Sequence, residues 1–586
     1  MRDRLSVVEL AFLPTSNIHD SIGAVTPARV NAMKSAWITG RFLFVGIIIC
    51  ATIVSMGSAH PLALLGVGQP KESLASKTTR DWKNSQSEDQ ATDKTKKKYD
   101  LAAELEKKGW KDPKFVLFVT GRQHGYMEPC GCITLALQKG GLMRRDSVRR
   151  NLVAKGWNVI PIDAGNQIRR VGNQPEIKIG HTYEALCRAM DYDVIGLGPD
   201  DVKLEGVNLG QKIENGKKLD GKNPFTCANV EVIEPGWINQ FTVVEKSGKR
   251  VGITMVLGDE HLAGASKGDI KTATADRALG VVSRKMRDAR NNMNVLVAFT
   301  SLEKCRDLAK KFPLFDVLVT AGGAGDPTKE PEIIPTSASS STSMIQVGVK
   351  GMYVGLVGYF VGTDGKPSIK YERVELTDRF EDSPAIKTVF KAYQNELKTR
   401  WETNTLADIR PRLHASGHSY VGSDACYDCH EEEYDIWKDG VDGTSGPHSE
   451  ATASLKHNPN DDRVWLERQF DPECVSCHST GWNAQDFYPY KTGYMDFEKH
   501  DMLHGNGCEN CHGPGSAHVA IQKEKDKGVR IDEEKRARLQ KEMRLTLEEA
   551  RRDACKECHD LDNSPDFLKE GGFDKYWPQI KHGKSE

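Results

Sequence analysis

The last third of the chain repeats one short motif four times: two cysteines three residues apart, followed at once by a histidine. Cysteines with this spacing lie on one helical turn and can both bond the vinyl groups of a haem, while the histidine ligates the iron. Zinc sites and thiol–disulfide centres also use paired cysteines, but neither explains a histidine after every pair. The motif therefore predicts c-type haem attachment. The predicted attachment residues are Cys426, Cys429, Cys474, Cys477, Cys508, Cys511, Cys555 and Cys558, and the predicted proximal iron ligands are His430, His478, His512 and His559.

The region that holds these motifs is also unusual in composition. Eight of the fourteen cysteines and twelve of the seventeen histidines lie beyond residue 413. Strand-forming residues are few there, and apolar side chains alone would make a poor core. Four covalently bound haems would supply that core themselves. We therefore expect residues 420–586 to form a mainly α-helical, loop-rich multihaem cytochrome c domain.

Sequence spacing does not identify the second axial ligand of each iron. Four haems take up to eight axial ligands, and the motifs supply four of them. Other histidines and methionines of the region could supply the rest, or could serve as structural residues that hydrogen-bond a propionate or a carbonyl. Spacing alone does not choose among them. The candidates are His414, His418, His448, His457, His500, His504, His518, His582, Met495, Met502 and Met543.

A family resemblance narrows this choice. The segments "YVGSDACYDCHEEEYDIW", "PECVSCHSTGW", "GNGCENCHGPGSAHV" and "CKECH" resemble, in this order, the tetrahaem cytochrome c-554 family, whose best-known members accept electrons from hydroxylamine oxidoreductase. The resemblance implies distal ligands at His448, His518 and His582. It also implies one five-coordinate haem, for which the second motif is the expected place. His518 is expected to reach the iron of a neighbouring haem.

A different pattern occupies the middle of the chain. Between residues 113 and 376, short β-rich runs such as "FVLFVTG", "NVIPIDAG" and "FDVLVTAGG" alternate with helical patterns, for example over 271–291 and 301–312. Strands that end in Gly or Asp and feed a loop and then a helix are typical of an α/β domain with functional loops at the strand ends. A helical connector is expected over 377–419.

The order of these strands and loops resembles the metallophosphoesterase domain of the 5′-nucleotidase family, which holds two metals on five loops. This chain keeps His124 and Asp163 at two of those positions. It has Arg122, Asn166 and Asp200 where the family pattern has metal ligands or their neighbours, and the loops "AFTSLEK" and "TAGGAGD" lack a histidine. The resemblance therefore implies the fold but not the metal-dependent activity.

One cysteine pair of this region stands apart. Cys130 and Cys132 follow the first loop and could form a sulfur-containing site with His124 and Asp163. The alternative is a tight loop whose thiols pair elsewhere or stay free. The region's remaining cysteines make the count odd, so at least one thiol has no partner within it. They are Cys187, Cys227 and Cys305.

The N-terminal part predicts export. An apolar run over 42–59 follows Lys34 and Arg41 and ends in small residues, as in a secretory signal. A retained anchor in the inner membrane is the alternative, and Met33 would be a suitable start for an ordinary signal peptide. We expect residues 1–68 to be signal or anchor, residues 69–112 to be a polar linker, and the rest to be periplasmic or otherwise exported.

Charge and motifs together order the functional hypotheses. With 81 basic and 82 acidic residues, no basic excess exists for binding nucleic acid. The leading hypothesis is an electron-transfer protein with redox partner proteins, in which the α/β domain serves for docking or sensing. The first alternative is a haem enzyme that reduces or oxidises a small nitrogen or oxygen species. The second is an exported metallophosphoesterase with a fused cytochrome.

Overall fold

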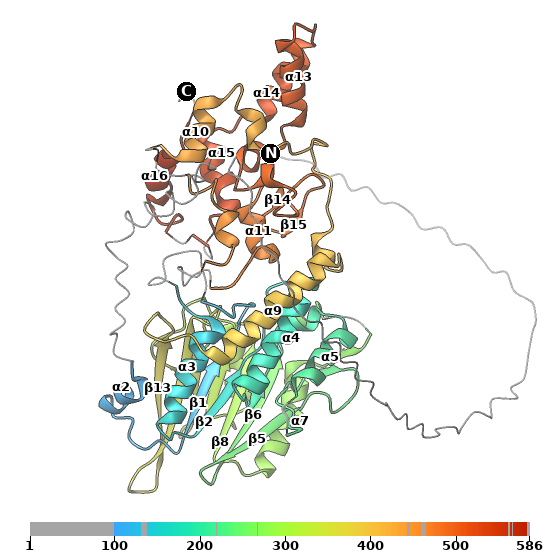
Figure 1. Ribbon diagram of the computed structural model, residues 1–586. Helices are drawn as coiled ribbons and strands as arrows, with labels where there is room; N and C mark the ends of the chain where they lie inside the picture. The colour runs from blue at the N-terminus through green and yellow to red at the C-terminus, as the bar shows by residue number, and fades with distance from the viewer. Residues whose placement is uncertain are drawn as a thin grey trace, which may run out of the picture. The chain divides into compact units, whose positions relative to one another are not determined.

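The computed structural model describes residues 99–129, 138–170, 172–217, 220–265, 268–441, 443, 446–458, 465–560, 563–564 and 566–582 (Figure 1). The N-terminal apolar run lies outside these ranges, as do Cys130 and Cys132. Within the described ranges, no helix is both long and apolar enough to cross a membrane. The predictions of a signal or anchor and of a thiol-containing site are therefore untested.

A five-stranded sheet forms the first half of the α/β region. Its strand order is β13-β12-β1-β2-β3. Strands β1, β2 and β3 run parallel, so their carboxyl ends and the loops that follow meet at one edge of the sheet. The bounds are β1 Phe115–Thr120, β2 Val159–Asp163, β3 Val194–Ile195, β12 Tyr353–Val361 and β13 Pro367–Glu375.

A six-stranded sheet forms the second half, in the order β10-β11-β9-β8-β6-β5. Every residue of β8 is buried, because this central parallel strand is covered on both faces. Strands β4 and β7 pair separately in a two-stranded sheet. The bounds are β4 Val230–Val232, β5 Phe241–Lys246, β6 Lys249–Leu257, β7 Ile270–Thr272, β8 Met293–Phe299, β9 Val317–Thr320, β10 Glu332–Pro335 and β11 Ser341–Gln346.

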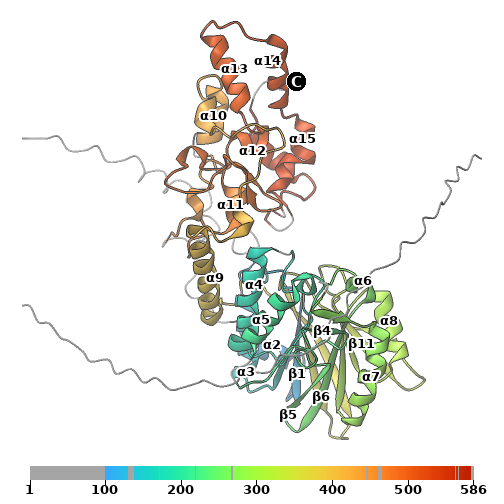
Figure 2. The same ribbon diagram turned by 90° about the vertical axis from the view of Figure 1, so that its right-hand side faces the viewer.

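The two sheets pack face to face with helices outside them. One hydrophobic cluster joins Phe118 and Ile162 of the first sheet to Ile253 and Val295 of the second. A second cluster joins the opposite face of the six-stranded sheet to two helices, α7 Ala275–Asp288 and α8 Leu302–Lys311. Figure 2 shows α7 and α8 on one side of the strands, with other helices on the opposite side. The α/β prediction is confirmed.

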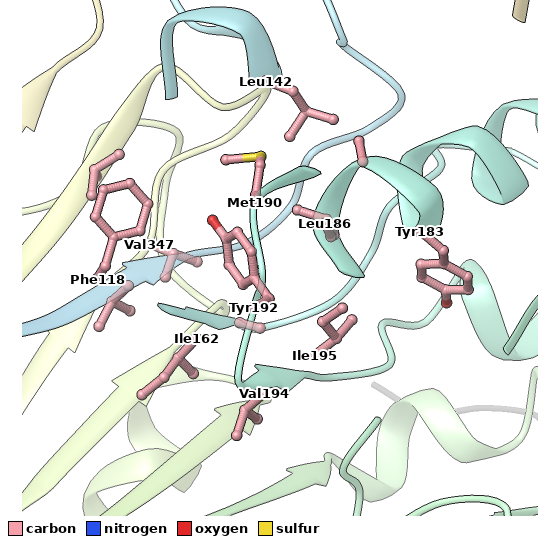
Figure 3. Close-up of a cluster of buried hydrophobic side chains, with 14 of the residues drawn as sticks. Phe118, Leu142, Ile162, Tyr183, Leu186, Met190, Tyr192, Val194, Ile195 and Val347 are labelled. Carbon is pink, nitrogen blue, oxygen red and sulfur yellow. The ribbon is translucent and has the colours of Figure 1, made fainter. Parts of the chain in front are cut away.

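The remaining helices of this region lie between the strands or after them. Figure 3 shows part of the core that they help to form, where Leu186 and Met190 lie near Tyr192 and Ile195. The bounds are α2 Leu101–Lys107, α3 Gly141–Ala154, α4 Asn173–Glu184, the π-turn η2 Ala185–Ala189, the 3₁₀ turn η3 Asp201–Lys203, α5 Gly206–Gly216, α6 Asp259–Leu262, α9 Pro384–Glu402 and the 3₁₀ turn η4 Ala407–Ile409.

Two sequence-based boundaries differ from the structure. Helix α2 lies within residues expected to be polar linker, because Leu101 and Leu105 bury against the region's core and Asp100 caps the helix. The helix expected over 271–291 begins only at Ala275, where Thr274 is the N-cap. The residues before it pair with β4 as strand β7.

The motif region is mainly helical and rich in loops, as predicted. Its only strands in the described residues are β14 Trp482–Asn483 and β15 Tyr488–Pro489. Its helices are short. They are the 3₁₀ turns η5 Ser423–Cys426, η6 Ala453–Leu455, η8 Asp501–Leu503, η9 Ala554–Glu557 and η10 Trp577–Gln579, and the α-helices α10 Glu431–Asp439, α11 Pro472–His478, α12 Cys508–His512, α13 Ser516–Asp526, α14 Glu533–Glu542, α15 Leu547–Arg552 and α16 Gly572–Tyr576.

Candidate functional site

Each of the four attachment motifs lies on or beside one helical turn. The second and third lie on helices α11 and α12, while the first and fourth run through the turns η5 and η9. A turn of this kind projects both thiols of a motif to one side, as attachment to two vinyl groups requires. The local backbone therefore suits the predicted attachment chemistry.

The proximal histidines of the last three motifs share one hydrogen-bonding arrangement. In each, Nδ1 lies within hydrogen-bonding distance of an oxygen atom. A histidine whose Nδ1–H donates in this way leaves the lone pair of Nε2 available to a metal. The pairs are His478 Nδ1 with Ala451 O at 2.9 Å, His512 Nδ1 with Met543 O at 2.7 Å, and His559 Nδ1 with Ser564 Oγ at 2.9 Å.

Two of these proximal histidines face a second histidine from a distant part of the chain. The ring centres of His448 and His559 lie 6.0 Å apart, and those of His512 and His582 lie 5.8 Å apart. Two imidazoles on one metal, each with a metal–nitrogen bond of about 2 Å, have ring centres about 6 Å apart. Both pairs therefore fit the two sides of a haem iron.

A third pair is arranged more loosely. Burial lowers the pKa of His518, and the neighbouring His430 lowers it further. Nδ1 of His518 is buried without a hydrogen-bond partner. His430 belongs to the first motif, whereas His518 follows the third, so these two histidines also come from different parts of the region.

Burial lowers the pKa of three of the four facing histidines. It lowers the pKa of His448 to about 4, with smaller contributions from His559 and His478. The pKa values of His512 and His559 are lowered too, chiefly by burial. Because imidazole must be deprotonated to bind a metal, these side chains are in the form that iron requires.

His478 belongs to the second motif. The histidine ring contacts of the described residues include neither His478 nor His430 of the first motif. Nδ1 of His478 also lies 3.2 Å from Ser454 Oγ, in addition to its contact with Ala451 O. His448, whose pKa is lowered by burial and then by His559 and His478, is close to His478 as well.

Thiols of different motifs lie next to one another, and these contacts give the order of the four motifs in space. Cys426 and Cys508 are close enough to hydrogen-bond, which raises the pKa of the first and lowers that of the second to about 7. A similar contact joins Cys477 to Cys558. Burial raises the pKa of Cys511, and the nearby Cys555 raises it further. These contacts give the four motifs the spatial order first, third, fourth and second.

The α/β region places several sequence-predicted residues at the carboxyl edge of β1, β2 and β3. Asp163 is fully buried, and every oxygen of its carboxylate is occupied. Arg145 Nη1 lies 3.1 Å from Oδ2, and Thr120 Oγ1 donates to the same oxygen at 2.7 Å. Gln167 Nε2 donates to Oδ1 at 2.6 Å. The guanidinium of Arg145, which is itself fully buried, thus supplies the positive charge that a metal would supply.

The second and third loops are bonded to each other. Asn166 donates from Nδ2 to Asp200 Oδ2 at 3.1 Å and accepts from the backbone of Asp200 at 2.8 Å. Asp201 accepts from the backbone nitrogens of Asn166, Gln167 and Gly198. Burial raises the pKa of Asp201 to about 7. These carboxylates hold loops together and leave no oxygen set for a metal pair.

The first loop keeps a strained backbone. Arg122 and His124 have φ values of 51° and 54°, in the left-handed region that non-glycine residues rarely adopt. Arg122 Nη1 donates to Gly323 O at 2.8 Å. Burial, and then the charge of Arg122, lowers the pKa of His124 to about 4. His124 is therefore uncharged at neutral pH. The charged groups that act on it are Asp200 and three cations, Arg122, Arg169 and Lys350.

The described residues of the α/β region consequently do not fit a dinuclear metal centre. No group of three or more His, Cys, Asp or Glu side chains with a metal-binding arrangement occurs among the described residues. Cys187, Cys227 and Cys305 are buried and form no disulfide. The sequence patterns identified Asp163 and His124. They did not identify Arg145, whose guanidinium lies beside the carboxylate of Asp163.

Comparison with known proteins supports the motif-based resemblance. Residues 425–513 match the family described as cytochrome c554 and c-prime. A curated relative, cytochrome c-554 of Nitrosomonas europaea, is 33% identical over 104 residues, which cover 16% of this chain and 39% of that protein. The resemblance to the cytochrome c-554 family, with covalently bound c-type haem, is thereby confirmed. The family match contains the first three motifs and ends before the fourth.

Structural comparison finds phosphoesterases over about half of the chain. The 5′-nucleotidase precursor from Thermus thermophilus is 19% identical with a TM-score of 0.43, and the match covers 49% of this chain and 59% of that protein. A putative 5′-nucleotidase from Staphylococcus aureus is 14% identical with a TM-score of 0.40, covering 58% of this chain and 64% of that one. Structural similarity at this level supports no conclusion about the activity of this chain.

Proposed function

We propose that this chain is an exported tetrahaem c-type cytochrome that carries electrons between redox partner proteins, with a non-catalytic α/β region that serves for docking or sensing. The observation that carries the proposal is the set of facing histidines. Pairs such as His448 with His559 and His512 with His582 have the separation expected across a haem iron. Bound iron of this kind supplies reversible one-electron chemistry.

The ligand set follows from these pairs. His430 and His518 would ligate the iron of the first motif, His512 and His582 that of the third, and His559 and His448 that of the fourth. Six-coordinate iron has no free position, so it passes electrons without binding a substrate. Three such haems favour electron transfer over catalysis as the main role.

The order of neighbouring thiols gives further support. Contacts between Cys426 and Cys508, and between Cys477 and Cys558, would bring haems of different motifs close together. Neighbouring haems allow electrons to cross the region in short steps. The path would run from the first motif through the third and fourth to the second.

A second candidate function rests on His478. Because the three distal histidines of the proposed ligand set belong to the other motifs, the iron of the second motif is proposed to be five-coordinate. An open position could bind a small nitrogen or oxygen species and make the protein a haem enzyme. The remaining alternative, a metallophosphoesterase, is disfavoured in the α/β region. Arg145 already occupies the carboxylate of Asp163, which would otherwise be a metal ligand.

The test combines haem counting with carbon monoxide titration of the holoprotein. We expect a pyridine haemochrome spectrum of four c-type haems per chain and one carbon monoxide bound per reduced chain. Replacing His518 with alanine should open a second iron, so two carbon monoxide molecules should bind. His500→Ala is the matched control, because His500 Nδ1 accepts a backbone hydrogen bond from Met495 and should leave the stoichiometry at one.

The outcomes separate the candidates. A spectrum without haem would overturn both haem-based functions. Turnover of nitric oxide or hydroxylamine at the single carbon monoxide site would favour the enzyme. Hydrolysis of a chromogenic phosphate ester on addition of manganese would contradict the non-catalytic assignment of the α/β region.

A further inference from the structure

The helix that carries the second attachment motif begins on polar side chains of the α/β region. Asp471, the N-cap of α11, is buried and accepts a hydrogen bond from the backbone of Glu473 at 3.1 Å. Gln174 of α4 donates to its Oδ1 at 2.9 Å, and Gln394 of α9 donates to its Oδ2 at 2.7 Å. Side chains distant in sequence thus fix the first residue of this helix.

An ion pair adds to this attachment. Lys178 of α4 lies with Nζ 2.5 Å from Oε2 of Glu473, and its own side chain is only 10% exposed. Glu473 directly precedes Cys474, the first thiol of the second motif. Lys178 therefore places a nearly buried positive charge beside the place where the haem of that motif would be bonded.

A shared hydrophobic cluster accompanies these polar contacts. Val475, between the two cysteines of the motif, is fully buried and belongs to the same large cluster as Ile177 and Ile179 of α4, and Cys474 packs against this cluster. The second motif is thus linked to α4 by Gln174 and Lys178 and shares its core.

We propose that the α/β region, through the ion pair of Lys178 with Glu473, sets the reduction potential of the haem held at Cys474 and Cys477. The inference rests on the proposed function, since it assumes a haem at the second motif. Reduction adds one electron, supplied by a redox partner, to ferric iron. A nearby positive charge favours the reduced state and a nearby carboxylate opposes it. Solvent weakens the effect of Glu473, whose side chain is 38% exposed, more than that of Lys178, which is 10% exposed.

The two members of the ion pair make opposite predictions. In Lys178→Met the carboxylate of Glu473 loses its ion-pair partner and keeps only the weaker contributions of Arg170 and Arg169, so the potential of the second haem should fall. In Glu473→Gln the lysine charge is offset only by Asp471, so the potential should rise. Lys178→Arg keeps the charge and should restore the wild-type value. A purely structural role would move both variants in the same direction.

The measurement is a spectroelectrochemical titration of the four-haem protein, in which the high-spin haem is followed by its own absorption band. Lys398→Met is the matched control. Lys398 lies on α9 and likewise pairs with a residue of the motif region, with Nζ 3.6 Å from Glu467 Oε2, but its side chain is 42% exposed, so solvent screens its charge. We expect no shift of the high-spin potential in this control.

Opposite shifts confined to the high-spin haem would support the inference. Shifts of the same sign in both variants, no shift, or equal shifts of all four haems would overturn it while leaving the proposed function intact. Loss of every haem signal in the wild-type protein would instead overturn the proposed function.

Discussion

The α/β region and the motif region of this chain differ in how many apolar side chains they bury. In the α/β region, two sheets and their helices bury long runs of apolar side chains, of which Phe118 and Ile162 are examples. In the motif region, the separate cluster beyond residue 540 contains only Ala550, Phe567 and Phe573 as buried members. Its helices are mostly one or two turns long. The α/β region therefore has a protein core of its own. The motif region shares part of that core through residues such as Val475 and Trp482, and we propose that haem fills the rest of its interior.

The largest effect should follow from preventing haem attachment at the third motif. Replacing both Cys508 and Cys511 with alanine removes the haem between two others. We expect the motif region to lose its fixed structure, because domains are only marginally stable and its short helices would lose the group proposed to fill its interior. Limited proteolysis with mass spectrometry should show residues 420–582 degraded and the α/β region intact.

The control for that experiment is Cys305→Ala, which removes a buried thiol from the α/β region. This variant should keep all four haems and a protease-resistant motif region. If the Cys508/Cys511 variant resisted proteolysis as well as wild type does, the motif region would have a protein core of its own, and the comparison would fail.

The next largest effect should come from the α/β region. Arg145→Ala would leave the buried carboxylate of Asp163 without its charge partner, which costs about 3–5 kcal/mol. Arg150→Ala on the same helix is the control, because Arg150 is half exposed and its ion pair is worth about 1 kcal/mol or less. Denaturant unfolding of both variants measures the difference. Equal losses would show that the buried pair has no special role.

A smaller effect depends on pH. The folded-state pKa of His124 is about 4, below the usual 6.5, because the side chain is buried beside Arg122. The unfolded chain therefore binds more protons between pH 6.5 and 4, and stability should decrease as pH falls through this window. The loss should be on the order of 2 kcal/mol after solvent screening.

Unfolding of the α/β region, followed at several pH values, measures this loss. His124→Gln should flatten the pH dependence over the same window. Besides Arg122, the charged groups that act on His124 are Asp200, which opposes the pKa shift, and Arg169 and Lys350, which add to it. An unchanged pH dependence in the variant would mean that another group is responsible.

The smallest effects compare helix caps in the two regions. Thr546 and Glu549 form a capping box at the start of α15, and Ser301 caps α8. Thr546→Ala and Ser301→Ala should each cost about 1 kcal/mol locally. Hydrogen exchange should show both losses. Only Ser301→Ala should lower the unfolding midpoint measurably, because α8 packs on the protein core; a comparable fall for Thr546→Ala would contradict the comparison.

The α/β architecture could be predicted because its signals are local. Apolar runs with Gly or Asp at their ends became β1, β2 and β9, and helix α9 lies where the connector helix was expected. Helix α2 was not predicted, because it follows a polar, lysine-rich segment and buries only two leucines and an alanine. Local patterns thus predict elements well but place their ends poorly.

The candidate site was predictable only where its chemistry repeats in the sequence. The attachment motifs are such a repeat, and the structure places each on a helical turn. Which distal histidine faces which motif is not local information, since His448 lies far from His559 along the chain and meets it only after folding. Arg145 carries no motif, and its role depends on the tertiary position of Asp163.

The order of the attachment sites has a consequence for assembly. The thiols of the first and second motifs neighbour those of the third and fourth, not each other. A chain emerging from its N-terminus would present the first two motifs while the partners of both were still being made. His582, which faces His512, follows the fourth motif along the chain. Under the proposed function, haems attached to the first two motifs would gain their neighbours only after the third and fourth motifs have emerged.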